Sequence, residues 1–363
     1  MAAPHRALGG LLILAACRRD KEPPVDRDTW DTGDVVATDW VAPACDAISG
    51  APALAFSVDG GSTVVPPESL PETGAVSWAL AALSTAGKLA FLHEGALYRS
   101  ADAGCTWTAT ALPGEDARQL SAGPDDALYA WSDERDVLYQ IADAGVTALT
   151  PPPEMVGLIV DPGDAAHLRA ADSGGTLWES TDGGASWAEL QRAPSKSLRV
   201  NSASFDPEDL DHVVCALSND DPFVSFNAGE RWDRAKGVTT ESDVNSFVVL
   251  IPPGDREVVW VQGVRLVDGV RVIWRSADGG LTFTSNVEED AEITLSNGVP
   301  MSVARTAPNE LVFGGDDTLY TWSARSGEMT SITPIAGYPI GAVLASEARG
   351  VYYLGLSNVV EAR

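Results

Sequence analysis

Short runs of apolar, β-branched and aromatic residues recur along this sequence in pairs, and each pair brackets a turn rich in Asp, Gly and Ser. The runs before the turns read ALYRS, VLYQI, TLWES, PFVSF, VIWRS and TLYTW, and those after them read TWTAT, VTALT, SWAEL, RWDRA, TFTSN and MTSIT. Such pairs predict β-hairpins. Two further runs precede each hairpin, punctuated by Pro, Gly and Asp. The pattern therefore predicts repeated units of four strands, named A to D in chain order.

The turn between strands C and D carries a repeated motif. With its acid position as reference, strong copies lie at Asp102, Asp182, Asn227 and Asp278, and degenerate copies lie at Asp59, Asp143 and Arg325. Successive copies are 39 to 51 residues apart, which matches one four-stranded propeller blade. Because a catalytic site is normally needed once, this repetition indicates an architectural role.

These turns resemble the Asp boxes, or BNR repeats, of a family of β-propellers that includes sialidases, xyloglucanases, sortilin-type receptors and a photosystem II assembly factor. The family motif is Ser/Thr-x-Asp-x-Gly-x-Thr-Trp/Phe. The matching residues here are Ser100, Asp102, Gly104 and Trp107; Ser180, Asp182, Gly184 and Trp187; Ser225, Asn227, Gly229 and Trp232; Ser276, Asp278, Gly280 and Phe283; and, in a degenerate copy, Asp143 and Gly145. The resemblance implies an all-β propeller whose boxes lie away from any active site.

The residue types of the motif suit a structural clip. A short carboxylate or amide accepts backbone N–H bonds within the turn, and glycine permits the positive φ that a tight turn needs. The aromatic residue packs between neighbouring sheets, which contributes roughly 2–3 kcal/mol of burial. We therefore expect the boxes to hold the blades together rather than to bind a ligand.

The number of units predicts the closure of the ring. Six complete units end with the boxes at 102, 143, 182, 227, 278 and 325. The tail from residue 340 supplies three more strands, and residues 62–67 supply a fourth. We predict a single propeller of seven four-stranded blades in which both ends of the chain share one blade, which removes the sheet edge. Eight blades, with a short first one, are the alternative.

The N-terminal residues resemble the signal peptide of a bacterial lipoprotein. Leu14-Ala15-Ala16-Cys17 follows a short apolar run and matches the lipobox, after which the cysteine carries lipid. Residues 1–16 are thus predicted to be a signal peptide, residues 17–47 a lipidated, acidic and disordered tether, and residues 48–363 the propeller. This organisation predicts a bacterial cell-envelope protein bound to a membrane through Cys17; the choice between inner and outer membrane stays open.

Three cysteines follow Cys17. Export permits a disulfide, and Cys45 at the end of the tether and Cys105 in the first strong box form the candidate pair. The sequence by itself does not establish this pairing. Cys215 lies within an apolar run and is predicted to be a buried free thiol.

The charge of the chain limits its partners. Acids outnumber bases 52 to 24, for a net charge of −28, which argues against nucleic acid as a partner. The predicted B–C loops share acidic residues, which form a candidate ligand face: Glu94, Asp133, Glu134, Asp136, Asp172, Asp220, Asp221, Asp268, Asp316 and Asp317. Such a ring would attract a cationic protein segment or calcium, although exposed loops of any acidic protein are acidic.

Catalytic signatures are weak in this sequence. The Arg-Ile-Pro signature of sialidases is absent from the N-terminal part, and with 52 acids a pair of glycosidase carboxylates carries no information. His93, His167 and His212 lie in different repeats without metal or triad spacing, and the last two are predicted to be surface groups. We therefore expect no catalytic residues, metal or cofactor, and a monomeric scaffold that binds a protein or a glycan. A cell-surface glycoside hydrolase, or an inactive relative of one, is the alternative.

Overall fold

The computed structural model describes residues 39–192, 199–238 and 243–359. The predicted signal peptide, Cys17 and the predicted tether up to residue 38 lie outside the described residues. No helix in the described part of the chain is long and apolar enough to cross a membrane.

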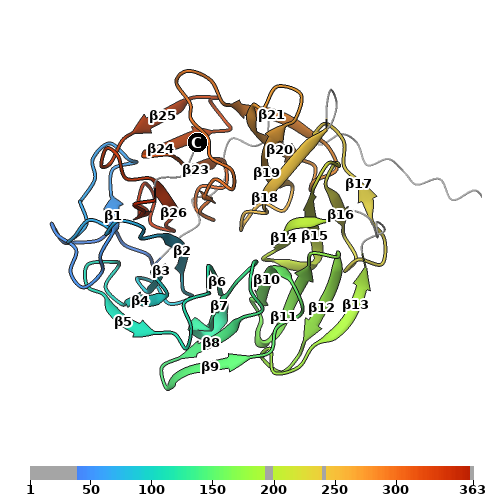
Figure 1. The fold of residues 1–363 in the computed structure, drawn as a ribbon, viewed down its shortest axis with the longest axis horizontal. Helices are drawn as coiled ribbons and strands as arrows, with labels where there is room; N and C mark the ends of the chain where they lie inside the picture. The colour runs from blue at the N-terminus through green and yellow to red at the C-terminus, as the bar shows by residue number, and fades with distance from the viewer. Residues whose placement is uncertain (1–38, 193–198, 239–242, 360–363) are drawn as a thin grey trace, which may run out of the picture. The chain divides into compact units, whose positions relative to one another are not determined.

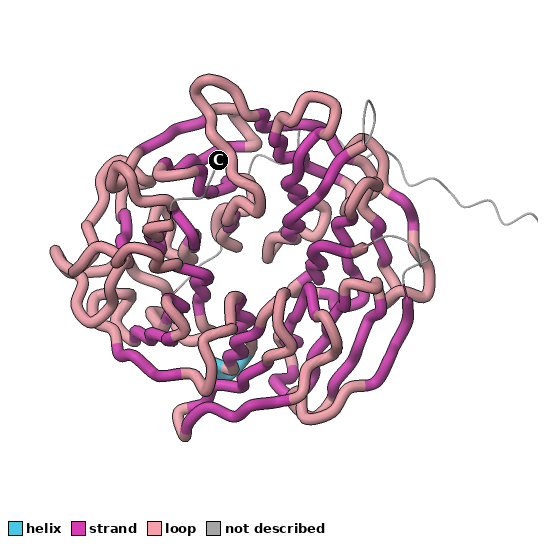
Figure 2. The backbone as a smooth tube through the Cα atoms, viewed as in Figure 1, coloured by secondary structure: helices cyan, strands magenta, loops and turns pink. Residues whose placement is uncertain are grey.

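Seven β-sheets surround a central axis, as Figure 1 shows. The prediction of a seven-bladed propeller is confirmed, and the eight-bladed alternative is wrong. In each blade the strands are antiparallel, and in six of the seven blades they follow chain order from the centre outward. The described residues include almost no helix apart from a short 3-10 turn at Pro124–Asp126, visible in Figure 2.

Six blades contain four consecutive strands. Blade 1 comprises β2 (Ser77–Ala82), β3 (Leu89–His93), β4 (Ala96–Ser100) and β5 (Thr108–Ala111); blade 2, β6 (Gln119–Ala122), β7 (Leu128–Trp131), β8 (Leu138–Ala142) and β9 (Gly145–Leu149); blade 3, β10 (Met155–Asp161), β11 (Asp164–Asp172), β12 (Thr176–Ser180) and β13 (Ala188–Arg192); blade 4, β14 (Val200–Asp206), β15 (Asp209–Leu217), β16 (Phe223–Ser225) and β17 (Asp233–Arg234); blade 5, β18 (Val244–Leu250), β19 (Val258–Arg265), β20 (Arg271–Ala277) and β21 (Phe283–Glu288); blade 6, β22 (Met301–Ser302), β23 (Glu310–Gly315), β24 (Thr318–Ser323) and β25 (Met329–Ile332).

Blade 7 closes the ring with strands from both ends of the chain. Its A and B strands are β26 (Ile340–Ala345) and β27 (Tyr352–Leu356), and its C strand is β1 (Leu54–Ser57), which pairs with β27. Val65 takes the D position through an antiparallel bridge to Phe56. The composite closure is therefore confirmed, but the tail supplies two strands rather than three. The N-terminal side supplies the other half, because β1 precedes the turn at Asp59.

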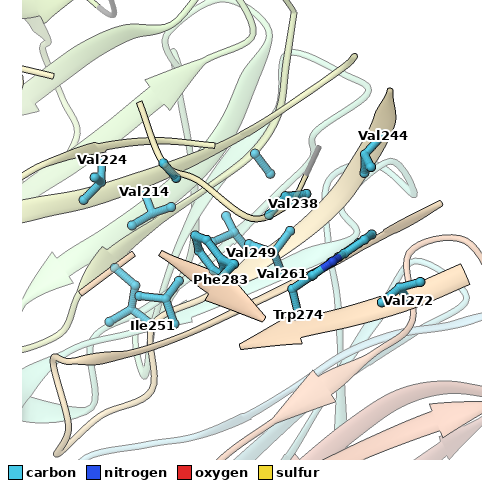
Figure 3. Packing of buried hydrophobic residues seen from close by; sticks show 13 residues of the cluster. Val214, Val224, Val238, Val244, Val249, Ile251, Val261, Val272, Trp274 and Phe283 are labelled. Atoms are coloured by element: carbon cyan, nitrogen blue, oxygen red, sulfur yellow. The ribbon is translucent and has the colours of Figure 1, made fainter. Parts of the chain in front are cut away.

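The core consists of apolar layers between adjacent blades. At the junction of blades 4 and 5, Val214 and Val224 of one sheet face Val249, Trp274 and Phe283 of the next, as Figure 3 shows. Both faces of most sheets are covered in this way, which explains why the strands are rich in apolar residues on both sides. Full burial of a side chain such as Phe283, which is 4% exposed, contributes about 2–3 kcal/mol.

The antiparallel connectivity gives each blade two ends. The A–B and C–D turns lie at one end, which we call the turn face, and the B–C and D–A loops lie at the other end, which we call the loop face. The predicted boxes are therefore on the turn face, and the predicted acidic loops are on the loop face.

Candidate functional site

Five C–D turns among the described residues share one hydrogen-bond pattern. In blade 1, the Ser100 hydroxyl donates to Asp102 Oδ1 (2.8 Å) and accepts the Gly104 N–H (2.9 Å). The Asp102 carboxylate in turn accepts the N–H and the hydroxyl of Thr106, at 2.9 and 2.7 Å. The same pattern recurs around Asp59, Asp182 and Asp278. Around Asn227 the amide oxygen accepts the Arg231 N–H, and the hydroxyl donor is missing because residue 231 is an arginine. Each turn is thus closed by its own side chains.

The aromatic residue after each strong turn lies against the core. Trp107 is 6% exposed and donates its indole N–H to the Gly104 carbonyl at 2.8 Å. Phe283 is buried, while Trp187 and Trp232 are half-buried and pack on clusters that include the preceding blade. These contacts join neighbouring sheets.

Two of the turn assignments from sequence need correction. Asp143 does not organise a box: β8 and β9 are joined by a two-residue turn, because Ala142 pairs with Gly145, and the exposed Asp143 carboxylate contacts Arg99 at 3.3 Å. The physical reason is that Ile141 replaces the serine that anchors the other turns. Conversely, the turn at Asp59, which lacks an aromatic residue, forms the full set of hydrogen bonds.

The histidines at the A–B turns were predicted to be surface groups, and this was wrong for His212. Its side chain is fully buried, between Asp206 (3.4 Å) and the Gly279 carbonyl of the next blade (2.9 Å). His167 is partly buried and contacts Asp161 at 2.7 Å and Glu179 at 3.0 Å. Burial alone would lower the pKa of His167, but the hydrogen bonds with both carboxylates outweigh it and raise the pKa.

His93 and Ser77 form a buried polar pair near the central channel. The Ser77 hydroxyl donates to the Leu356 carbonyl at 2.6 Å and lies 3.0 Å from His93 Nδ1. Burial lowers the pKa of His93, which favours the neutral imidazole. Because the serine proton is directed to a carbonyl, this pair is arranged to join blades 1 and 7 rather than to activate a nucleophile.

Cys45 and Cys105 form a disulfide with a Cα–Cα distance of 5.9 Å. Beside it, the Ser49 N–H donates to the Cys105 carbonyl at 3.0 Å, and the Trp107 N–H donates to the Ser49 carbonyl at 2.9 Å. The segment before the first strand is therefore fixed to the turn of blade 1. Cys215 is a free, fully buried thiol, and burial raises its pKa to about 12, which leaves it unreactive.

The ten acids predicted for the ligand face do not converge on one point. Most of them bind groups of their own or adjacent loops: Glu94 binds the Val76 N–H, Glu134 binds Arg118, Asp136 binds the Glu154 N–H, Asp172 binds the Thr176 N–H and Trp178 Nε1, Asp220 and Asp221 bind Arg234, and Asp268 binds Arg265 and the Val270 N–H. Burial raises the pKa of Asp133. These contacts stabilise the loops, so fewer of the ten acids are available to a ligand than the sequence indicates.

Asp316 and Asp317 line a cavity of about 650 Å³ at the loop-face end of the central channel. Its other polar and aromatic lining includes Trp78, Gln119 and Asn297. Trp78 and Gln119 lie at the inner ends of blades 1 and 2, and residues 296–300 lead into blade 6. Together with Ile340 and Gly341 of blade 7, these residues make one hollow on the loop face to which four blades contribute.

The electrostatics of this cavity are mixed. The Arg118 guanidinium lies 4.4 Å from the centre of the Trp78 ring and contacts Glu134 at 2.5 Å. One face of the indole is therefore covered by a cation that is itself paired. Asp317 accepts the Gly337 N–H at 2.7 Å, which fixes the carboxylate at the rim. The arrangement suits a ligand that carries a cation and a small apolar group.

The sequence indicated Asp316 and Asp317 but missed Trp78, Gln119 and Asn297. These residues come from separate blades, and the ring closure that brings them together is not local. The available signal was their position at or just before an innermost strand, where side chains lie near the channel. Among the described residues, no group of three or more His, Cys, Asp or Glu side chains is placed to hold a metal.

Comparison with known proteins supports the fold and gives one relative. No family model matches the sequence. The chain is 34% identical over 340 residues to the dispase autolysis-inducing protein of Streptomyces mobaraensis, which covers 88% of this chain and 90% of that protein.

Solved structures with the same fold are more distant in sequence. YCF48 from Cyanidioschyzon merolae matches with a TM-score of 0.56 and 12% identity over 78% of this chain and 96% of its own; YCF48 bound to a D1 peptide matches with 0.55 and 12% over 79% and 95%. The GH74 enzyme of Niastella koreensis gives 0.58 and 15%, over 78% of this chain and 52% of its own. At these identities the likeness shows the β-propeller fold.

Proposed function

This chain belongs to the family of the dispase autolysis-inducing protein, and on this premise we propose that it is a non-catalytic, protein-binding propeller whose partner is a proteolytic enzyme. The relative's name states that it induces the autolysis of dispase. Autolysis requires an enzyme molecule whose own chain becomes susceptible to cleavage. A propeller that binds the enzyme can favour such a state through differential affinity, without a catalytic group of its own.

The cavity at the channel mouth is the observation that carries this proposal. Asp316 and Asp317 give it negative charge, and the edge of Trp78 gives it apolar surface. We propose that a Lys or Arg side chain of the partner enters it and pairs with the two carboxylates. The net charge of −28 favours approach of a cationic surface over long range. The peptide in the YCF48 complex is bound by that protein, and it illustrates that this fold accommodates peptide ligands.

The binding test compares charge-neutralising variants of equal net charge. Asp316→Asn/Asp317→Asn keeps the shape and the acceptor oxygens of the rim but removes two charges. We expect the Kd for dispase, measured by isothermal titration calorimetry, to rise about tenfold or more, since tenfold corresponds to about 1.4 kcal/mol. The control, Glu189→Gln/Glu328→Gln, changes two exposed acids outside the loop face and should bind like the wild type. Equal binding by both double variants would contradict the site.

We further propose that the repeated turns are Asp boxes and that the protein is an exported bacterial lipoprotein anchored at the cell envelope through Cys17. The lipobox at residues 14–17 supports this. We expect the mature chain to be a monomer without a cofactor, so that millimolar calcium leaves the melting temperature unchanged. Replacement Cys17→Ser should move the protein from the membrane fraction to the soluble fraction, and unchanged fractionation would contradict the anchor.

A glycan ligand is the second candidate. Trp78 beside Asp316 and Asp317 supplies an aromatic residue and carboxylates of the kind that sugar sites use. However, Arg118 covers one face of Trp78, which leaves less of the ring for stacking on a pyranose. Release of reducing sugar from xyloglucan, or of sialic acid from a sialoside, with loss of release in Asp316→Asn/Asp317→Asn, would favour this candidate over a protein ligand.

A further inference from the structure

Each box turn occupies a defined place between two blades. A backbone N–H of the turn donates to a carbonyl of the A–B turn, or of the first residues of strand B, in its own blade: Ala103 to Gly87, Gly183 to Ala166, Ala228 to Asp211, Gly279 to Glu257, and Gly60 to Gly350. A glycine of the turn lies against the preceding blade, as Gly184 does against Leu138 and Leu149. The turn therefore fills the outer groove between its own blade and the one before it.

Blade 2 leaves this place empty. Its C–D connection is the two-residue turn Asp143–Ala144, which is too short to reach over blade 1. The structure has a cavity of about 680 Å³ at this junction, lined on the blade 1 side by Lys88, Arg99 and Thr108 and on the blade 2 side by Asp126, Ile141 and Asp143. We call this cavity the blade 1–2 groove.

The neighbouring junction shows what such a groove normally holds. The strands LYRSADAG (residues 97–104) and LYQIADAG (138–145) align without gaps, so Arg99 in blade 1 corresponds to Gln140 in blade 2. Gln140 donates to the Tyr129 hydroxyl at 3.0 Å, and Tyr129 donates to the Gly183 carbonyl of the blade 3 turn at 3.2 Å. Arg99 thus stands at the position that supports an Asp-Gly-Gly turn one blade further on.

The degenerate copy at Arg325 in blade 6 also lacks this turn, because the Ser326 N–H, rather than a glycine N–H one residue later, donates to the Ser323 hydroxyl. Its junction with blade 5 is filled by a large side chain instead. Blade 6 has Trp322 where blade 2 has Ile141, and the two residues pair with equivalent positions of their B strands. Trp322 is 8% exposed and packs edge-on to Trp260 of blade 5, with 5.3 Å between ring centres. Because Ile141 is much smaller than tryptophan, the blade 1–2 groove stays open.

The groove is lined by two cations, Lys88 and Arg99, and by three acids, Asp125, Asp126 and Asp143, so an acidic ligand would bind through Arg99 by replacing an exposed acid. Lys88 is held by Asp126 at 2.6 Å, whereas Arg99 contacts Asp143 at 3.3 Å, and the Asp143 side chain is fully exposed. An exposed ion pair of this kind is worth little, so a carboxylate that enters the groove can replace Asp143 at small cost. The guanidinium then offers two parallel N–H donors to that carboxylate.

We propose that the blade 1–2 groove is a docking site for an exposed acidic β-turn of another protein, of the Ser/Thr-x-Asp-Gly-Gly type that fills the equivalent place at three other junctions of this chain, at Asp59, Asp182 and Asp278. The partner's turn would take the place of the missing box, with its carboxylate on Arg99 and its glycines against blade 1. This site lies on the turn face and is independent of the channel-mouth cavity.

The test uses a cyclic peptide with the sequence of residues 178–189 (WESTDGGASWAE), titrated by fluorescence anisotropy into the full-length protein. We expect saturable binding that weakens at least tenfold in Arg99→Glu, and for a peptide whose Asp is replaced by Asn. Arg231→Glu is the matched control, because Arg231 is an exposed arginine of the blade 4 turn, and it should bind like the wild type. Absence of saturable binding, or equal affinity of Arg99→Glu, would overturn the proposal.

A second variant closes the groove from within. Ile141→Trp introduces the residue that blade 6 uses, and it should abolish peptide binding while the melting temperature stays at or above that of the wild type. If the peptide binds only after deletion of residues 2–38, the groove is occupied by this chain's own N-terminal segment, and the proposal of a partner's turn is wrong.

The Asp316→Asn/Asp317→Asn variant should bind the peptide with the affinity of the wild type. This result would separate the test of the blade 1–2 groove from the test of the proposed function.

Discussion

The Asp126 carboxylate and the Lys88 ammonium group meet across the junction of blades 1 and 2, with 2.6 Å between Oδ2 and Nζ. Ser84 and Thr85, in the same turn as Lys88, donate three more hydrogen bonds to this carboxylate, at 2.7 to 3.0 Å. Burial alone would raise the pKa of Asp126, but these hydrogen bonds outweigh it and lower the pKa to about 2. One carboxylate therefore joins two A–B turns where no box turn does so.

This ion pair predicts a specific loss of stability in acid. Because the pKa of Asp126 is lower in the folded chain than the usual 3.8, its stabilisation is present above about pH 4 and is lost as the pH falls towards 2. Asp126→Asn should lower the free energy of unfolding by about 2 kcal/mol at pH 7. Urea denaturation from pH 7 to pH 2 measures this, and the gap between wild type and variant should shrink over that range. A gap independent of pH would contradict the role of the charge.

The turns at Asp102 and Asp143 predict opposite outcomes for the same substitution. Asp102→Ala removes the acceptor of the Thr106 N–H and hydroxyl, and we expect a loss of about 1–3 kcal/mol. Asp143→Ala removes an exposed group that contacts Arg99, and we expect a change within about 0.5 kcal/mol. Chemical denaturation of both variants decides this. Equal effects would mean that the hydrogen bonds of the box are not what stabilises the turn.

Two glycines with positive φ separate backbone strain from packing. Gly104 (φ 89°) lies so close to Tyr353 that a Cβ would be 2.7 Å from its ring, whereas Gly74 (φ 91°) has open space around it. Both alanine variants carry the strain of the left-handed region, about 1–2 kcal/mol. Gly104→Ala should lose about 1–3 kcal/mol more than Gly74→Ala, because Tyr353 must move. Similar melting temperatures for the two variants would contradict close packing of the box on blade 7.

The disulfide between Cys45 and Cys105 encloses a sequence separation of 60 residues. A crosslink of this length restricts the unfolded chain, and its removal in Cys45→Ser/Cys105→Ser should cost about 2–4 kcal/mol. Differential scanning calorimetry with and without reductant measures the loss. The double variant should be insensitive to reductant, and the wild type should approach it when reduced. A wild type whose melting temperature is unaffected by complete reduction would rule out a stabilising role for the bridge.

The sequence was sufficient to predict those turns whose hydrogen bonds join residues no more than four positions apart. The hydrogen-bonded turns at Asp102, Asp182 and Asp278 could be identified from the sequence because the serine, acid, glycine and aromatic residue lie in one turn. The assignment of Asp143 failed because the Asp-Ala-Gly segment is identical to that at Asp102, while the difference that matters is Ile141 in place of Ser100. A hydroxyl two residues before the acid is therefore a better criterion than the acid and glycine themselves.

Features that depend on ring closure could not be predicted from the sequence. His212 is buried by Gly279 of the following blade, which is 67 residues away, and no local pattern indicates this. The sequence predicted which loops carry acidic residues, but not what each acid contacts. Asp172 accepts hydrogen bonds from Thr176 and Trp178 of its own blade, whereas Asp317 lines the cavity at the channel mouth. The blade 1–2 groove likewise follows from a missing turn, which becomes visible only when the blades are superposed on one another.

The most direct test of the proposed function measures the self-digestion of dispase. Dispase is incubated with the wild-type protein, with Asp316→Asn/Asp317→Asn, with Glu189→Gln/Glu328→Gln, or with buffer, and its fragments are followed by mass spectrometry over time. We predict faster accumulation of fragments with the wild type and the Glu189→Gln/Glu328→Gln control than with the Asp316→Asn/Asp317→Asn variant or buffer. Equal rates with the wild type and with buffer would contradict the account.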